Sequence, residues 1–167
     1  MKKVLLVLNL ALALVLCGIP VALADDMATI GISARGEEIS ITVEPSTWDF
    51  LVVSAGGVSA TGISSFRLTN NSSVTIDITI AGTDLSGTGE NNWILAAEPE
   101  EDTYALDAGL ADTDSVYDIP VTKIPITLVG DLGATSNQDF GLVLSAPTSI
   151  SDADIKSGDV IISAVKA

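Results

Sequence analysis

The stretch GISSFRLTNNSSVTIDITI, residues Gly62–Ile80, decides the fold. Its second half, Val74–Ile80, alternates strictly, with valine or isoleucine at every second position and threonine or aspartate between them. Its first half alternates in the same way around Phe66 and Leu68. A period of two is that of a half-buried β-strand, because successive side chains point to opposite faces of a sheet. The polar run Asn70–Ser73 is typical of a turn, so the stretch predicts a β-hairpin with one apolar and one polar face.

Short segments of the same kind recur along the rest of the chain, separated by turn residues about every ten positions. No apolar repeat of 3.6 residues is long enough to indicate a substantial helix. The sequence therefore predicts an all-β fold, an antiparallel sandwich of roughly 8–10 short strands. Pro120 and Pro125 cannot donate to a ladder, so the strand that contains them should be an edge or bulged strand. The expected strands outside the hairpin are Ala28–Ser33, Glu37–Val43, Trp48–Val53, Trp93–Ala97, Tyr104–Leu106, Tyr117–Val129, Phe140–Ser145 and Asp159–Ala164.

The first 24 residues have the pattern of a secretory signal peptide. Lys2 and Lys3 give a positive start, an apolar run covers residues 4–16, and Ala22-Leu23-Ala24 matches a small-residue cleavage site. We therefore expect residues 1–24 to be removed on export and residues 25–167 to form a single β-sandwich domain. The alternative is an uncleaved membrane anchor, since the apolar stretch approaches the roughly 20 residues that span a bilayer.

Charge and residue types exclude several classes of function. The chain has 22 acidic and seven basic residues, and removal of residues 1–24 leaves five basic residues and a formal net charge of −17. Five scattered cations cannot neutralise the phosphates of a nucleic acid or hold an anionic membrane. The chain has no histidine and, without residues 1–24, no cysteine, which excludes His- or Cys-dependent nucleophiles and the usual zinc, haem and copper sites. We expect a protein that is not an enzyme, requires no cofactor, binds no nucleic acid and contacts a membrane only through the signal peptide before cleavage.

The acid-rich segment at residues 98–118 is the part of the chain best suited to a cation. Carboxylates are hard oxygen ligands of the kind that Ca²⁺ prefers. The alternative is a solvated acidic loop without metal, and the pair Asp152 and Asp154 presents the same choice on a smaller scale. Three aspartates are spaced closely enough to share one ion: Asp112, Asp114 and Asp118.

Trp48 and Trp93 are the only tryptophans, and each has two readings. They could form a platform on which a sugar ring stacks, or they could pack in the core. Each lies in an alternating strand context, so core packing is the expectation.

Two groups of residues resemble known families. Pro45, Trp48-Asp49-Phe50 and the run Phe66-x-Leu68-x-Asn70 resemble the pattern of immunoglobulin-like domains of the MSP/ASH/hydin type, over about residues 39–95. The triplet Trp93-Ile94-Leu95, behind an export signal, is similar to WxL-type bacterial cell-surface domains. Both resemblances imply a non-enzymatic β-sandwich, and the first implies an antiparallel immunoglobulin-like sandwich.

The sequence thus predicts an exported structural or adhesive protein, secreted or held at a microbial cell surface. Its partner would be another component of the cell envelope, a glycan or a second copy of itself. Two alternatives stay open. A carbohydrate- or cell-wall-binding module would need exposed aromatic residues. A strand-exchanging fibre or pilus-like subunit would donate its N-terminal strand, Ala28–Val43, to the sheet edge of a neighbour.

Overall fold

The two halves of the Gly62–Ile80 stretch form the strands that their alternation predicts, but these strands lie in different sheets. In a computed structural model of the protein, β3 (Phe66–Asn70) belongs to a larger sheet and β4 (Ile76–Gly82) to a smaller one. The predicted β-hairpin is therefore wrong, although both of its strands exist. The structure describes residue 33 and residues 36–89, 91–111, 116–152 and 154–167.

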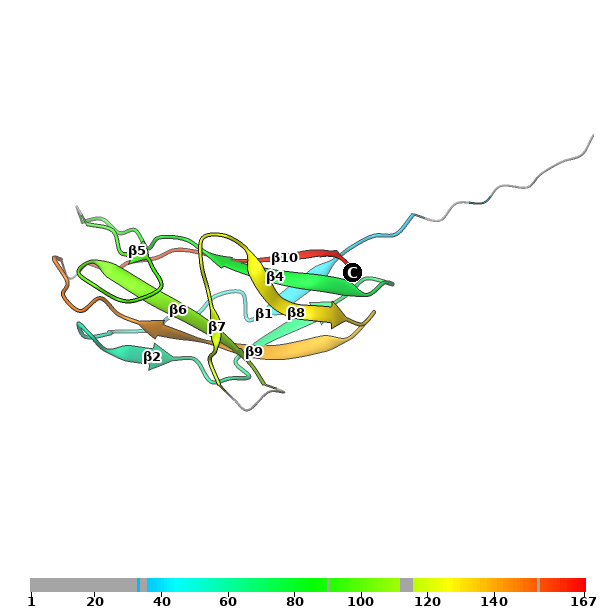
Figure 1. The fold of residues 1–167 in the computed structure, drawn as a ribbon, viewed down its shortest axis with the longest axis horizontal. Coiled ribbons are helices and arrows are strands. Elements are labelled where there is room, and N and C mark those ends of the chain that lie inside the picture. The colour runs from blue at the N-terminus through cyan, green and yellow to red at the C-terminus, as the bar shows by residue number, and fades with distance from the viewer. Residues whose placement is uncertain (1–32, 34–35, 90, 112–115, 153) are drawn as a thin grey trace, which may run out of the picture. The chain divides into compact units, whose positions relative to one another are not determined.

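The larger sheet has seven strands, in the order β1-β3-β9-β6-β5, with β2 also paired to β9 and β7 to β6. All its pairs are antiparallel except β5 with β6. One edge of β9 pairs with β6, and the other pairs first with β3 and then with β2 (Figure 1). Besides β3, its strands are β1 (Ile41–Glu44), β2 (Val58–Ala60), β5 (Ile94–Leu95), β6 (Thr103–Leu110), β7 (Ile119–Pro120) and β9 (Asn137–Ser145).

The smaller sheet has three antiparallel strands in the order β10-β4-β8. β8 spans Ile126–Leu132 and β10 spans Val160–Lys166. β10 pairs with β4 along its whole length, whereas the pairing of β8 with β4 is interrupted by two shifts of register. Both β8 and β10 are edge strands of this sheet.

Asn70 explains why the chain changes sheet after β3. Its side chain is fully buried. Its Nδ2 carries two N–H donors and lies 2.9, 3.0 and 2.9 Å from the carbonyl oxygens of Val74, Leu132 and Gly133, respectively, so two of these acceptors share one N–H. Its Oδ1 accepts a 2.8 Å hydrogen bond from the Ser72 N–H. These bonds tie the connection after β3 to the end of β8, so the chain continues into the smaller sheet and does not fold back along β3.

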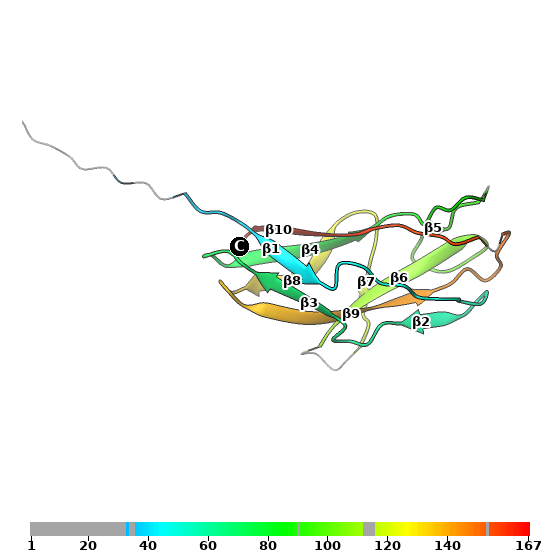
Figure 2. The same cartoon turned by 180° about the vertical axis from the view of Figure 1, so that it is seen from behind.

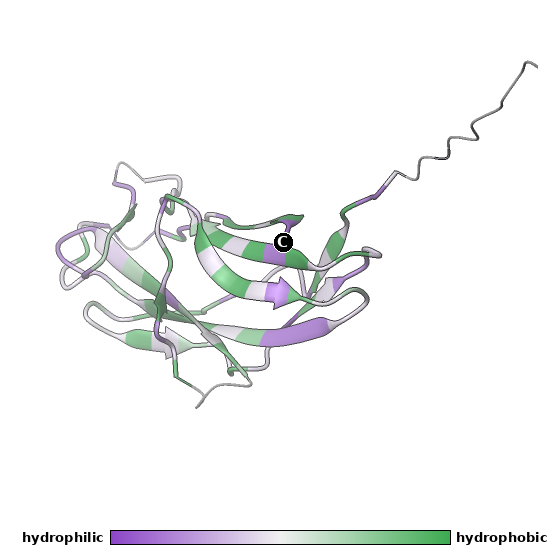
Figure 3. Cartoon of the chain, turned by 45° about the vertical axis from the view of Figure 1, so that its right-hand side comes forward, coloured by the Kyte–Doolittle hydropathy of each residue, from purple (hydrophilic) through white to green (hydrophobic). Residues whose placement is uncertain are grey.

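The core lies between the two sheets. Ile76, Ile78 and Ile80 of β4 are completely buried, as is Leu68 of β3. The Phe66 ring stacks on Phe140 of β9 with centroids 5.1 Å apart. The apolar faces that the alternation predicts therefore meet in one cluster, and apolar and polar residues alternate along the strands in Figure 3.

These features confirm the all-β class with mostly antiparallel pairing in a sandwich-like arrangement. Ten strands and no helix occur among the described residues. The segment expected as one strand, Tyr117–Val129, forms as two, because β7 ends at Pro120 and β8 begins after Pro125. Both lie at edges, as the prolines predict.

The chain divides into two units, Met1–Arg35 and Gly36–Ala167, and all ten strands belong to the second. The predicted signal peptide, residues 1–24, lies outside the described residues, and so does the expected strand Ala28–Ser33 except for Ser33. Within the described ranges, no helix is long and apolar enough to cross a membrane.

Candidate functional site

The second unit contains a groove with a volume of about 980 Å³. One wall is Trp48–Val53, which connects β1 to β2, and the other is the connection from β9 to β10, at Ile150–Asp152 and Asp154–Gly158. Leu85, Trp93 and Leu144 also line it. The lining is mainly apolar, with aspartates at residues 49, 152 and 154. Such a groove is suited to an apolar or amphipathic ligand.

The wall Trp48–Val53 departs from its sequence-based prediction. Its β-branched and aromatic residues predict a buried strand, yet none of its residues is in a strand. Leu51 is 81% exposed and Val52 is 96% exposed. Leu51 also has φ of 60°, which is uncommon for a bulky side chain and interrupts an extended run. The predicted strand is therefore wrong for the single chain.

The two tryptophans both line the groove, and they differ in burial. Trp48 is 47% exposed and meets Phe66 edge to face, with centroids 5.7 Å apart, so its predicted core packing is wrong. Trp93 is half-buried and packs against the core, so it is closer than Trp48 to the core packing expected for both tryptophans. Its Nε1 is shielded from solvent, and no described residue accepts a hydrogen bond from it.

Asp152 and Asp154 hold the β9–β10 connection in place. The side chain of Lys156 is only 3% exposed, and its ammonium donates a 2.6 Å hydrogen bond to Asp152 that holds the pKa of Asp152 below its usual value. Asp152 also accepts from the N–H groups of Asn91 and Asp154, and Asp154 accepts a 2.7 Å hydrogen bond from the Thr88 hydroxyl. These carboxylates are engaged in fixing a wall of the groove.

Asp102 braces the same connection from the turn between β5 and β6. Its carboxylate accepts hydrogen bonds from the hydroxyl and the N–H of Ser151, which lower the pKa of Asp102. Asp102 also has φ of 49°, and its N–H donates to the Ser149 carbonyl. Nothing in the sequence indicates this role, because Asp102 and Ser151 are far apart in the chain.

The predicted metal ligands do not form a described site. Asp118 is exposed just before β7, and Asp112 and Asp114 lie outside the described residues. In the part of the chain that the structure describes, no three acidic side chains converge on a position for an ion. The calcium site stays a prediction.

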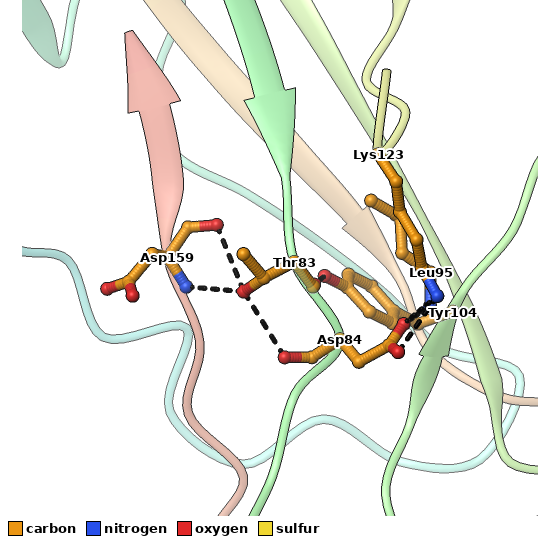
Figure 4. A network of polar contacts seen from close by, with 6 residues as sticks. All are labelled: Thr83, Asp84, Leu95, Tyr104, Lys123 and Asp159. Carbon is orange, nitrogen blue, oxygen red and sulfur yellow. Dashed lines mark hydrogen bonds and ion pairs between the residues drawn. The ribbon is translucent and has the colours of Figure 1, made fainter. Parts of the chain in front are cut away.

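A polar network beside the core joins β4, β5, β6 and β10 (Figure 4). The Tyr104 hydroxyl donates to the Thr83 carbonyl, and burial, followed by the charge of Asp84, raises the pKa of Tyr104. Asp84 accepts from Lys123 and from the Leu95 N–H, and these bonds lower the pKa of Asp84. Since each group is engaged in joining elements, the network is suited to stability and not to proton transfer.

Asp107 on β6 is the described carboxylate with the opposite shift. Burial raises the pKa of Asp107, and the nearby charge of Glu98 raises it further. Neither carboxylate lines the groove.

Comparison of the sequence with models of known protein families and with curated proteins found no match.

Proposed function

We propose that the protein is an exported, non-enzymatic, immunoglobulin-like β-sandwich that serves as a structural or adhesive component of a microbial cell surface. The observation that carries this proposal is the groove. Its Trp48–Val53 wall leaves the apolar side chains of Trp48, Leu51 and Val52 exposed to solvent, and a group of exposed apolar side chains is typical of a contact with another macromolecule.

The ion pairs support a structural role. Four occur among the described residues, and each joins elements or fixes a loop: Arg67 with Asp139, Lys123 with Asp84, Lys156 with Asp152 and Lys166 with Glu37. Three of these pairs are largely exposed and contribute little to stability, whereas the pair of the buried Lys156 with Asp152 fixes a wall of the groove.

Surface location is tested on intact source cells. An antibody against the protein should label intact cells as strongly as permeabilised cells, and the N-terminus of the labelled protein should be Asp25. Labelling that requires permeabilisation would contradict the proposal.

A carbohydrate- or cell-wall-binding module is the second candidate, and the exposure of Trp48 favours it. A sugar stacking on this ring should quench its fluorescence. Cell-wall glycan should therefore quench the native protein and a Trp93→Phe variant but not a Trp48→Phe variant. Equal fluorescence with and without glycan in all three proteins would remove this candidate.

A further inference from the structure

The wall Trp48–Val53 has the residues of a strand and lacks a strand's partner. Among the described residues, none of these six forms a backbone–backbone hydrogen bond, although the Leu51 N–H donates a 2.7 Å hydrogen bond to the Asp49 side chain. The link to its neighbour β2 is a single long bond of 3.4 Å, from the Ser59 hydroxyl to the Phe50 carbonyl. Unpaired backbone beside exposed apolar side chains is a template on which another extended segment can pair.

The rest of the groove offers matching chemistry. On the opposite wall, Ile155 is 91% exposed, while Ser157 is held by paired backbone bonds to Ser86. An occupant should therefore carry both apolar side chains and backbone hydrogen-bonding groups, which an extended peptide does. The volume of about 980 Å³ lies near the upper end of the roughly 300–1,000 Å³ of small-ligand pockets and suits such a peptide.

We propose that this groove binds Ala28–Ser33 of a second copy of the chain as an added strand, so that copies join head to tail. This proposal rests on the proposed structural function and names its partner. The segment has six residues, as many as Trp48–Val53, and Ile30 and Ile32 alternate with small or hydroxyl-bearing residues. It is uncharged, and Arg35 follows it closely, where it would suit a groove that contains Asp49 and Asp154.

Strand register indicates a second copy as the source. β1 begins at Ile41, which lies opposite Asn70 of β3. The adjacent residue of β3, Thr69, pairs with Asn137, the first residue of β9. The start of β1 therefore lies near the start of β9. The groove contains Leu144, seven residues further along β9, or roughly 24 Å at the rise of an extended strand. The start of β1 and the C-terminus thus lie at one end of the unit, and β2 and β5 at the other (Figure 2).

The Trp48 part of the groove lies nearer to β1, because Trp48 packs on Phe66, which pairs with Phe140. To reach the part of the groove at Leu144 in its own chain, a segment preceding β1 would have to turn back and run along the sheet. A neighbour's segment can enter directly. Because the donor segment and the groove are different parts of the chain, the contact is heterologous, and it generates open chains of copies unless its rotation closes a ring.

Cysteine cross-linking of residues 25–167, the expected exported form, which contains no native cysteine, tests the proposal. A chain carrying both Ile30→Cys and Val52→Cys should give a ladder of covalent multimers on mild oxidation. A chain carrying Ile30→Cys and Ile124→Cys is the matched control, since Ile124 is 76% exposed and does not line the groove. Unchanged thermal midpoints of the reduced variants establish that each is folded.

Each outcome decides the question. A ladder specific to the Val52 pair supports the proposal. A cross-linked monomer would assign the groove to the chain's own segment, and equal or absent cross-linking in both variants would also overturn the proposal.

As a second measurement, Val52→Glu should raise the concentration for half-association by at least about fivefold, while Ile124→Glu should not. Surface labelling of intact cells is independent of these results, so the broader function can survive their failure.

Discussion

Replacing Asn70 by aspartate should destabilise the domain strongly, and the loss should depend on pH. The substitution keeps the shape of the side chain and the acceptor for the Ser72 N–H. It replaces a fully buried NH₂ group, whose two N–H donors serve three carbonyl oxygens, by an oxygen that faces all three. At about 1 kcal/mol for each lost bond, plus the cost of an unpaired buried charge, we expect a loss of about 3–5 kcal/mol near pH 7.

The pH dependence follows from the environment of the introduced carboxyl group. Burial among carbonyl oxygens raises its folded-state pKa above the value of about 3.9 in the unfolded chain. Folding then favours the protonated form, so stability is regained as pH falls below the folded-state pKa and is lost as pH rises through it. A variant that is unfolded near pH 7 should therefore fold near pH 4.

Urea unfolding at several pH values measures both effects, with Asn71→Asp as the matched control. The Asn71→Asp substitution makes the same chemical change at an exposed neighbouring residue. The Asn71 side chain donates one long hydrogen bond of 3.4 Å to the Thr42 hydroxyl. The control also reports how the protein's general acidity affects stability. Equal losses in the two variants, or parallel pH profiles, would refute the role assigned to Asn70 in directing the chain between the sheets.

Three further changes test the packing and the polar network. Gly141→Ala should cost about 1–3 kcal/mol in urea unfolding, because a Cβ there would lie 2.4 Å from the Gly62 carbonyl oxygen, whereas Gly36→Ala, with nothing within 4 Å, should be nearly neutral. Tyr104→Phe keeps the buried ring but leaves the Thr83 carbonyl unpaired, so unfolding experiments should show a loss of about 1–2 kcal/mol. Asp84→Asn should lower the thermal midpoint near pH 7, and the difference should shrink as pH falls through the depressed pKa of Asp84, because the ionised carboxylate contributes its stability only above that pKa; a difference that does not change with pH would contradict this.

The sequence predicts the strands better than their assembly, for a physical reason. The alternation that defines β3 and β4 is local, because a strand's two faces are set by neighbouring residues. The assignment of these strands to different sheets depends on Asn70 bonding to a carbonyl 62 residues away, which no local pattern records. The polar turn residues therefore predict that the chain changes direction after β3, but they do not predict which sheet the next strand joins.

The groove was beyond prediction for a related reason. Its walls, Trp48–Val53 and the β9–β10 connection, are separated by about a hundred residues, and contacts such as Asp102 with Ser151 bring them into place. The apolar pattern of Trp48–Val53 predicts burial, and the single chain leaves it exposed. Under the proposed assembly, the residue pattern and the exposure agree, because the covering strand comes from another copy.

Salt provides a last test that links this groove to the acidity of the chain. An exposed, unpaired apolar segment invites indiscriminate aggregation, and a net charge of −17 on the exported form opposes it by repulsion between copies. The donor segment itself is neutral and gains its binding free energy from apolar burial and backbone pairing, which salt does not weaken, whereas the neighbouring Arg35 adds a smaller contribution that salt screens. Raising NaCl from about 0.02 to 0.3 M shortens the Debye length severalfold, so light scattering should show tighter association of copies. Weaker association at high salt would mean that ion pairs dominate the contact, and it would exclude strand addition by Ala28–Ser33 as its main source.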